Sequence, residues 1–319
     1  MLDNALKKQL FTNMVRTRAM EERLIKMAKS ADGHFWIGGP GEEAFNVPLG
    51  TLVNKGYGID YDYTHLHYRS SGCIIGMGEE PINLIRQMAS VKTDPYSGGR
   101  HFVNHPAIKK WNVCPVNAPI ETQYSFAIGT AKAQRNSKKG ITIVTGGDAG
   151  TAEGDFATCL VWASRPQEEL PILIVVTNNR FGISTPYSEV NGTKSIVARA
   201  EAFNMKTDVI NGNDPEESYT RLKAAMDYVR KERKPFCLEA SVSRLHGHSS
   251  SSGANRIYDQ EDCIENYKAK LLDEKVLTKK EVDSIIDAAH QECKDALDQV
   301  RKEEKPSSDS VYMHTFKEE

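Results

Sequence analysis

The 319-residue sequence has no long hydrophobic run and no marked excess of charge of one sign. No stretch approaches the roughly 20 apolar residues that a membrane-spanning helix needs, and the N-terminus lacks the apolar core of a signal peptide. Lys and Arg total 41 and Asp and Glu total 43, so no surplus of positive charge favours nucleic acid or anionic membranes. We therefore expect a cytoplasmic globular protein with no nucleic-acid partner and no membrane partner.

Clustered cysteines and nucleotide-binding signatures are also missing. The six cysteines include no C-x-x-C pair, which argues against a structural zinc site and against a disulfide framework. Most of these thiols are expected to fill the core, and Cys114 and Cys263 fit that interpretation least well. The G-x-G-x-x-G turn of dinucleotide-binding folds and the G-K-[ST] end of a P-loop are both absent.

Helices alternate with strands between residues 120 and 245. The apolar runs at 141–145 and 172–176 lack the strict alternation of half-exposed strands, which is typical of strands buried on both faces. The expected elements are helices near 125–134, 195–203 and 215–231, another helix between the first two strands, and strands at 141–146, 172–177, 207–211 and 235–244. This order predicts an α/β fold, a doubly wound parallel sheet with helices on both faces.

Longer helices and loops flank this region. We expect a helix near residues 10–27, turns at 37–45 and a long polar loop at 92–106. Thr278 and Glu281 form a T-x-x-E capping box that begins an amphipathic helix. We expect one domain at residues 1–256 and a helical extension at 257–319 that packs on it.

Polar residues follow two neighbouring strands of the predicted sheet. Asp148 comes after the glycine-rich end of one strand, and Asn178 and Asn179 end the next. Ligands bind at this edge of a parallel sheet, where helix N-termini favour anions. A carboxylate repels phosphate unless a divalent cation such as Mg2+ lies between them, so the pattern indicates a metal–diphosphate site. A structural alternative remains, in which Asp148 caps a helix and the asparagines form a turn.

The same stretch resembles a known motif. The segments GDAGTAEGDF and LPILIVVTNNRFGIST are similar to the thiamine-diphosphate motif of the alpha subunit of the decarboxylase component of 2-oxo acid dehydrogenase complexes. That motif begins Gly-Asp-Gly and ends Asn-Asn. The segments GPGEEAF, HYRSSG, DPYSGGRHFVNHP, NAPIETQ and SRLHGHSSS also resemble family segments, in family order. SGGR and the segment around RLHGHS favour the branched-chain (2-oxoisovalerate) subclass, with pyruvate or acetoin dehydrogenase as the alternative.

The resemblance implies a thiamine-diphosphate-binding fold and a set of cofactor contacts. Asp148, Asn179 and the backbone carbonyl of Phe181 would hold Mg2+, while Tyr68 and Arg69 would bind the diphosphate. The implied cofactor-binding residues are Tyr68, Arg69, Ala118, Ile120, Gly147, Asp148, Ala149, Gly150, Asn179, Phe181, Arg244 and His248. The main chain near Ala118 and Ile120 would meet the aminopyrimidine ring of the cofactor.

Thr122 and Gln123 match a loop that holds a monovalent cation in the branched-chain enzymes, so the resemblance also implies K+. His248 is the implied catalytic residue, which contacts the diphosphate and moves a proton as the acyl group leaves; a pKa near the working pH suits that role. His246 is a less favoured candidate for a second active-site imidazole. Candidate walls of the substrate pocket are Phe35, Trp36 and Tyr68.

The implied reaction is decarboxylation of a 2-oxo acid on thiamine diphosphate, followed by reductive acylation of a lipoyl group on an acyltransferase component. Heteromeric members of the family take the glutamate that activates the cofactor from a beta subunit. We therefore expect an alpha2beta2 heterotetramer, with the C-terminal extension also packing on the partner subunit, and no such role for Glu42 or Glu43. A function of another class also fits, a diverged non-catalytic alpha-like subunit with a binding or regulatory role.

The chain departs from the family pattern in three places, one of which is a longer spacer before Asn179, in SRPQEELP, that is expected to enlarge a surface loop. Gly-Asp-Gly is Gly147-Asp148-Ala149 here, and an alanine is compatible with the cofactor only if its φ is negative. After His248, the acidic residues common in the family are replaced by SSSSGANR. This segment is expected to be a polar active-site loop, and its serines, Ser249 to Ser252, are candidate phosphorylation sites.

Overall fold

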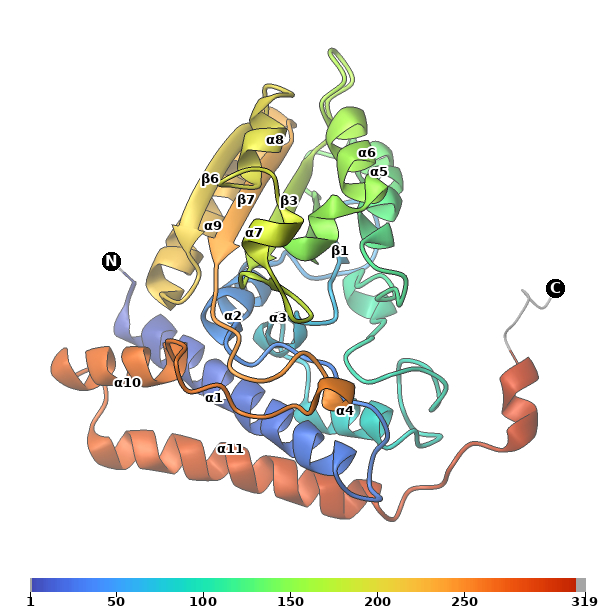
Figure 1. Ribbon diagram of the computed structural model, residues 1–319, viewed down its shortest axis with the longest axis vertical. Coiled ribbons are helices and arrows are strands. Elements are labelled where there is room, and N and C mark those ends of the chain that lie inside the picture. The colour runs from blue at the N-terminus through green and yellow to red at the C-terminus, as the bar shows by residue number, and fades with distance from the viewer. Residues whose placement is uncertain (1, 314–319) are drawn as a thin grey trace.

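The fold is built on a five-stranded parallel sheet. The structure is a computed structural model that describes residues 2–313. The strands lie in the order β1-β2-β3-β7-β6, and every neighbouring pair is parallel (Figure 1). Their bounds are β1(Tyr63–His65), β2(Thr142–Gly147), β3(Ile172–Asn178), β6(Lys206–Asn211) and β7(Phe236–Ser241). The predicted α/β fold class is confirmed.

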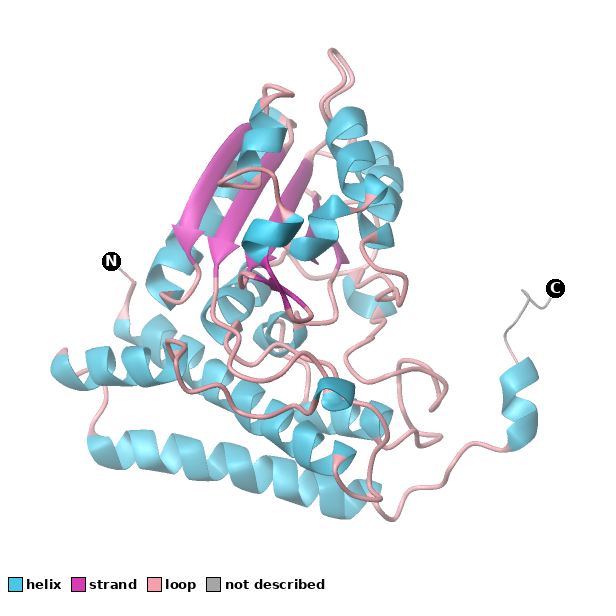
Figure 2. Ribbon diagram, viewed as in Figure 1, coloured by secondary structure: helices cyan, strands magenta, loops and turns pink. Residues whose placement is uncertain are grey.

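Both faces of the central strand β3 are covered. Ile172, Ile174 and Val176 belong to a cluster with side chains of four helices on one face. Leu173 and Val175 belong to the main core on the other face, which α9 covers. All five side chains are fully buried, each contributing about 1.5–3 kcal/mol by leaving water. Figure 2 shows helices on both sides of the strands. The covering helices are α5(Thr122–Gln134), α6(Gly154–Ala163), α8(Val197–Glu201) and α9(Pro215–Glu232).

A layer of helices lies below the sheet. The long helix α1 runs through it, and α11 lies alongside α1 at the base (Figure 1). The Thr278 hydroxyl accepts from the Glu281 N–H, and the Glu281 carboxylate accepts from the Thr278 N–H, so the predicted capping box is confirmed. The helices of this layer are α1(Asn4–Ala28), α2(Glu43–Leu52), α3(Ser71–Gly76), α4(Pro81–Met88), α10(Cys263–Asp273) and α11(Lys279–Val300).

The apolar side chains of α10 and α11 belong to the same core as those of α1 and α2. The C-terminal extension therefore has no separate core, and a boundary at residue 256 stays a prediction. None of the helices within residues 2–313 is long and apolar enough to cross a membrane.

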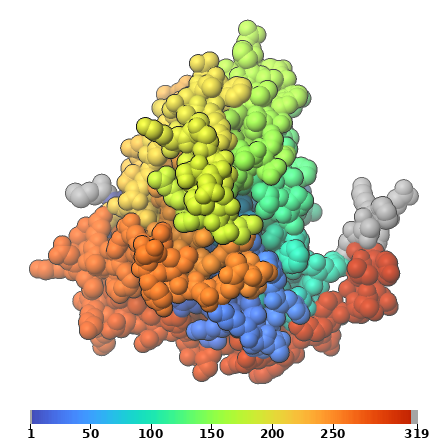
Figure 3. Space-filling model, in the orientation of Figure 1, coloured from blue at the N-terminus to red at the C-terminus, as the bar shows by residue number. Residues whose placement is uncertain are grey.

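Several shorter elements complete the chain. They are η1(Lys109–Trp111), η2(Ala149–Ala152), β4(Phe181–Gly182), β5(Thr185–Pro186), α7(Tyr187–Val190), η3(Ser250–Ser252) and η4(Ser308–Tyr312). The segment after β7 crosses the front of the molecule, where the orange atoms of Figure 3 separate the base from the upper half. Its serines are tied to the core, because the Ser250 N–H donates to the Trp36 carbonyl and the Trp36 N–H donates to the Ser250 hydroxyl. This loop thereby holds His248 at the edge of the sheet.

Candidate functional site

A cavity of about 290 Å3 lies where β2 and β3 end. Of the twelve residues predicted to bind the cofactor, ten line it. These ten are Tyr68, Arg69, Ile120, Gly147, Asp148, Ala149, Gly150, Asn179, Phe181 and His248. They come from five separate segments, so the fold assembles most of the predicted site from residues up to 180 positions apart.

Asp148 is the charged group at the centre of this edge. It is 2% exposed, and its Oδ2 atom is buried without a hydrogen-bond partner. Burial raises the pKa of its carboxyl to about 6, although N–H groups of the turn and the charge of Arg69 oppose that rise. Its backbone is fixed, since the Asp148 N–H donates to the Thr177 carbonyl and the Thr151 hydroxyl donates to the Asp148 carbonyl. A buried carboxylate oxygen without a partner favours a bound cation.

The two adjacent asparagines have different surroundings. Asn178 donates through Nδ2 to Glu239 at 2.7 Å and accepts from the Arg180 N–H, so it stabilises the turn on one side of the sheet. Asn179 lines the cavity on the other side, because successive side chains of a strand point to opposite faces. Its Oδ1 accepts from the Phe181 N–H at 3.1 Å, which leaves this oxygen a second lone pair. Both asparagines thus form a turn, as the structural alternative predicts, and Asn179 also lines the cavity, so its role as a metal ligand stays a prediction.

Arg69 joins the cavity to His248. One guanidinium nitrogen, Nη1, donates to the Gly38 carbonyl at 2.5 Å, and Nη2 lies 2.8 Å from Nδ1 of His248. The guanidinium carbon lies 5.1 Å from the centre of the Tyr68 ring. Since arginine can only donate, Nδ1 of His248 must accept, and the proton of the neutral ring lies on Nε2.

The electrostatics of His248 differ from the expectation. Burial, together with the positive charges of Arg69 and Arg244, lowers the pKa of His248 to about 4. In the ligand-free chain the pKa of His248 therefore lies below the value near the working pH that we expected. At neutral pH the ring is uncharged and offers an Nε2–H donor. Its neighbour His67, which also lines the cavity, has a pKa well below the ordinary value, mainly through burial.

The predicted metal ligands are one carboxylate, one amide oxygen and one backbone carbonyl. Within residues 2–313, no three side chains of His, Cys, Asp or Glu gather in a way that could hold a metal ion. The predicted set of Asp148, Asn179 and the Phe181 carbonyl is not such a cluster. Hard oxygen donors of this kind suit Mg2+, whose remaining ligands are commonly water and phosphate oxygens.

Sequence reasoning missed Glu121. Its side chain lines the cavity, is 1% exposed, and accepts from the Gly147 N–H at 2.9 Å. Burial raises the pKa of this carboxyl to about 8. Glu121 also has a left-handed backbone with φ of 63°. No local pattern links residue 121 to the strand end at 147, so only the fold could reveal this contact.

Several predicted residues lie elsewhere. Trp36 was wrong as a pocket wall, because it is fully buried and its Nε1–H donates to Glu21 at 2.7 Å. Phe35 lines a different cavity of about 230 Å3 with His101 and Phe102. Of the three proposed walls, Tyr68 alone lines the cavity at the sheet edge.

Two predicted cofactor residues are outside the lining of this cavity. Ala118 is exposed and lies two residues before Ile120, which lines the cavity. Arg244 lies behind the wall, with its guanidinium 4.8 Å from the centre of the Phe181 ring and Nη1 donating to the Ile183 carbonyl. His246 also lies outside the lining and contacts the Ala254 carbonyl through Nδ1.

The glutamates at 42 and 43 are both buried but have different partners. Glu43 forms a two-point ion pair with Arg18, at 2.6 and 2.9 Å. Glu42 lies behind the cavity, where burial raises its pKa to about 7 and hydrogen bonds to Thr177 and Asn179 oppose that rise. Neither lines the cavity, and the expectation that neither activates the cofactor stays a prediction.

The cysteines are all free thiols. Cys263 is buried with its thiol 3.5 Å from Glu43, and Cys114 is half-buried with its sulfur 3.6 Å from Nε2 of His65. The other four are buried, as predicted for core residues.

Ala149 replaces a family glycine without strain. Its φ is not positive. Its methyl group occupies the space in front of Gly182, where an added Cβ would lie 2.6 Å from the Ala149 Cβ. Gly182 thus makes room for Ala149.

Comparisons with known proteins agree with this arrangement. The family model described as "Dehydrogenase E1 component" matches residues 12–309. The chain is 30% identical over 261 residues to the 2-oxoisovalerate dehydrogenase subunit alpha of Bacillus subtilis (strain 168), covering 82% of this chain and 77% of that protein. It is 28% identical over 249 residues to the mitochondrial subunit alpha 2 of that enzyme from Arabidopsis thaliana, covering 78% of this chain and 51% of the relative. With the human mitochondrial subunit alpha it is 24% identical over 321 residues, covering 97% and 70%.

The chain thus spans about half the length of the Arabidopsis relative and three quarters of the Bacillus one. The predicted resemblance is confirmed by a family match over most of the sequence, and this chain belongs to the dehydrogenase E1 component family, the thiamine-diphosphate-dependent 2-oxo acid dehydrogenases.

Proposed function

We propose that this chain is the catalytic alpha subunit of a branched-chain 2-oxo acid dehydrogenase. The subunit would decarboxylate its substrate on thiamine diphosphate and pass the acyl group to a lipoyl group of an acyltransferase component. The observation that carries the proposal is the buried, unpartnered Oδ2 of Asp148, in a cavity shared with Arg69 and His248. A non-catalytic subunit would not need to keep a buried carboxylate oxygen without a partner.

The residues present fit the cofactor. Asp148, Asn179 and the Phe181 carbonyl would hold Mg2+, and the metal would offset the charge of a diphosphate beside the carboxylate. Tyr68 and Arg69 would bind the diphosphate, with the second guanidinium nitrogen already aligned by His248. Gly147 leaves space in front of the strand end, because an added Cβ there would have no atom closer than 3.7 Å.

Thiamine diphosphate, when bound, supplies a carbon nucleophile and an electron sink for loss of CO2. The chain's own contribution is to hold the diphosphate end and to exclude water around it. His248 would donate from Nε2–H at neutral pH, since Nδ1 is engaged by Arg69. An anionic ligand next to this ring would raise the pKa of His248 and would bring it nearer to that of a proton-transfer group.

The substrate class rests on the relatives. The Bacillus, Arabidopsis and human proteins are each named as 2-oxoisovalerate dehydrogenase alpha subunits, and the sequence segment SGGR had already favoured that subclass. Pyruvate or acetoin as the substrate is the alternative. Binding pockets separate aliphatic substrates by only about 1–3 kcal/mol per methylene, so direct comparison of 2-oxoisovalerate with unbranched 2-oxo acids is required.

A beta partner is part of the proposal. Several exposed apolar side chains lie on α5 and α6 and at the cavity rim, namely Ile120, Phe126, Val161 and Trp162. Helix α6 also exposes the small residues Gly154 and Ala157, which would allow a partner to approach its backbone closely. We propose that a beta subunit covers this surface and supplies the glutamate that activates the cofactor, in an alpha2beta2 assembly. The C-terminal extension would also contact that subunit.

The cytoplasmic location is likewise proposed. The Arabidopsis and human relatives are named as mitochondrial, and the name of the Bacillus relative gives no compartment. Fractionation of the source cells would test it.

The decisive experiment is a decarboxylation assay of the chain co-expressed with its beta partner. CO2 release from 2-oxoisovalerate, 2-oxobutyrate and pyruvate would be measured with thiamine diphosphate, MgCl2 and an artificial electron acceptor. We expect activity from the complex, none from the isolated chain, and the highest kcat/KM with 2-oxoisovalerate. Asp148→Asn should abolish the activity of the complex. Asp283→Asn makes the same change on an exposed face of α11 and should leave the activity unchanged. Absence of CO2 release by the complex with all three compounds would contradict the proposal.

A further inference from the structure

The loop predicted to hold a monovalent cation is closed by its own hydrogen bonds. Gln123 is 3% exposed, and its Nε2 donates to Glu121 Oε2 at 2.9 Å and to the Thr145 carbonyl at 3.1 Å. The Thr122 hydroxyl donates to the Pro119 carbonyl at 3.1 Å. Both implied cation ligands, Thr122 and Gln123, therefore already have partners within the protein.

The orientation of the Gln123 amide follows from its neighbours. A backbone carbonyl can only accept, so the contact with Thr145 must come from the amide nitrogen of Gln123, and the same nitrogen donates to Glu121 Oε2. The side chain of Gln123 must therefore turn its NH2 group toward both. In that position the NH2 group lies between two oxygens and donates to both, where a bound cation would attract both. The amide oxygen of Gln123 points away from them.

Glu121 connects this loop to the metal-binding turn. Its other oxygen, Oε1, accepts from the Gly147 N–H at 2.9 Å, one residue before Asp148. Two glycines of the strand exit make room for the carboxyl group, since an added Cβ at Gly146 or at Gly150 would collide with it. Gly150 has no positive φ, so its lack of a side chain serves this contact rather than an unusual backbone.

We propose that Glu121 and Gln123 form an internal bridge that takes the place of the monovalent cation in this chain and positions the turn that carries Asp148. The bridge consists of three hydrogen bonds, Gly147 N–H to Glu121, Gln123 to Glu121 and Gln123 to the Thr145 carbonyl. Glu121 is then a positioning residue for the metal site. The K+ requirement implied by the family resemblance does not fit these residues. The inference rests on the proposed function only for the role of Asp148.

The first test compares cations without any substrate. Thermal unfolding of the alpha–beta complex would be followed in KCl, NaCl and tetramethylammonium chloride at equal ionic strength, with and without thiamine diphosphate and MgCl2. We expect the same Tm and the same Kd for the cofactor in all three salts. A saturable, K+-specific rise in Tm or fall in Kd would overturn the proposal. Because the melting measurement needs no 2-oxo acid, this outcome is distinct from a failure of decarboxylation.

The second test removes the bridge. Glu121→Ala should weaken binding of MgCl2 with thiamine diphosphate by about 10-fold or more, the usual effect of losing an outer-shell contact. Glu121→Gln keeps one oxygen that can accept from the Gly147 N–H, so it should retain tighter binding than Glu121→Ala. Glu304→Ala, at a side chain 84% exposed, is the matched control and should bind like the wild type. Isothermal calorimetry gives the Kd, and the Tm of each cofactor-free variant shows whether it folds. A folded Glu121→Ala complex with the wild-type Kd would overturn the positioning role.

Discussion

Nη2 of Arg69 lies 2.8 Å from Nδ1 of His248, which links the arginine proposed to bind the diphosphate to the proposed proton donor. The pair fixes the neutral tautomer of His248 and leaves Nε2–H for the ligand. Their segments lie 179 residues apart in the sequence, so the pair forms only when the loop after β7 crosses the base of the sheet.

Substitutions that imitate one ring nitrogen each can separate these two roles of His248. His248→Asn retains an acceptor close to the position of Nδ1, whereas His248→Gln retains a donor close to that of Nε2. If donation from Nε2 matters for catalysis, His248→Asn should lose about 10²-fold or more in kcat and His248→Gln should lose less. Steady-state kinetics of the alpha–beta complex gives the comparison, and equal losses in both variants would contradict the assignment.

Asp148 should be a source of instability in the metal-free chain. Its buried carboxyl has an oxygen without a partner, and burial raises its pKa to about 6. Asp148→Asn removes the negative charge, so it should raise the Tm of the metal-free chain while abolishing the increase in Tm that MgCl2 with thiamine diphosphate produces. Such opposition between stability and function is common at binding sites.

Calorimetric melting with and without the two ligands gives both quantities. Asp283→Asn serves as the control for the loss of one carboxylate on the surface, and it should keep the ligand-induced increase. A metal-free Tm that falls in Asp148→Asn would show that the carboxylate stabilises the turn by itself.

The sequence predicted the parts of the fold that depend on burial. The runs at 141–145 and 172–176 are apolar on both faces, and they are the inner strands β2 and β3. Helix α2 begins inside the segment 37–45 that was expected to consist of turns, and it contains Pro48 and Gly50, neither of which favours a helix. Packing overrides that preference, since Gly50 lies so close to the Cys73 carbonyl that a Cβ would collide with it.

The site was predictable where the resemblance supplied the residue and the sheet edge supplied the place. Asp148, Asn179, Arg69 and His248 meet at one cavity as expected. The prediction that Trp36 is a wall of the substrate pocket was wrong, because the sequence of a glycine-rich segment does not indicate whether an aromatic residue in it faces a pocket or the core. Glu121 was missed because Gly147 and Gly150, which it contacts, are distant from it in the sequence. The resemblance to the motif already explained why these two positions are glycine.

Buried carboxyls should make the metal-free chain less stable at alkaline pH. Burial raises the pKa of Glu21 from 4.5 to about 7, and Glu42 and Glu121 shift in the same direction. A raised pKa means that the folded state holds the proton more tightly than the unfolded state. The stability that these groups contribute is therefore complete below about pH 4.5 and is lost as the pH rises to about 8.

The buried histidines act in the opposite direction. Burial lowers the pKa of His65, His105 and His248 to about 4, so the stability that they contribute is present above the ordinary pKa of 6.5 and is lost as the pH falls toward 4. We therefore expect the Tm of the metal-free chain to reach its maximum at mildly acidic pH. Melting curves from pH 4 to pH 9 would check this.

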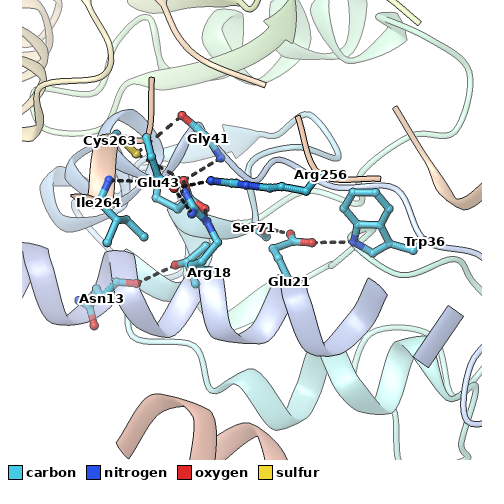
Figure 4. A network of polar contacts seen from close by, with 12 residues as sticks. Asn13, Arg18, Glu21, Trp36, Gly41, Glu43, Ser71, Arg256, Cys263 and Ile264 are labelled. Atoms are coloured by element: carbon cyan, nitrogen blue, oxygen red, sulfur yellow. Dashed lines mark hydrogen bonds and ion pairs between the residues drawn. The ribbon is translucent and has the colours of Figure 1, made fainter. Parts of the chain in front are cut away.

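Glu21 is the carboxyl best suited to test the alkaline decline. It is fully buried between Trp36 and Ser71, both of which point toward it in Figure 4, and it also accepts from Asn104. The raised pKa of Glu21 corresponds to a loss of roughly 3 kcal/mol in the free energy of unfolding between pH 4.5 and pH 8. Glu21→Gln does not ionise, so the unfolding free energy of this variant should fall less steeply above pH 5 than that of the wild type, whatever its absolute value. Glu304→Gln should keep the wild-type slope, and an unchanged slope in Glu21→Gln would contradict the assignment.

Ala149 and Gly182 should behave as a coupled pair. Because a Cβ at Gly182 would lie 2.6 Å from the Ala149 Cβ and 3.8 Å from the nearest atom of Val190, the methyl of Ala149 is the main obstacle to a side chain there. Gly182→Ala alone should therefore destabilise the chain by about 1–3 kcal/mol through overpacking. Ala149→Gly removes the obstacle, so the double variant should recover most of that loss. Chemical denaturation of the four proteins gives the coupling free energy, which should exceed about 0.5 kcal/mol for residues in contact. Additive effects of the two substitutions would mean that the turn shifts to admit both methyl groups, and the position of the Asp148 carboxylate would then be less firmly fixed than the hydrogen bonds of this turn imply.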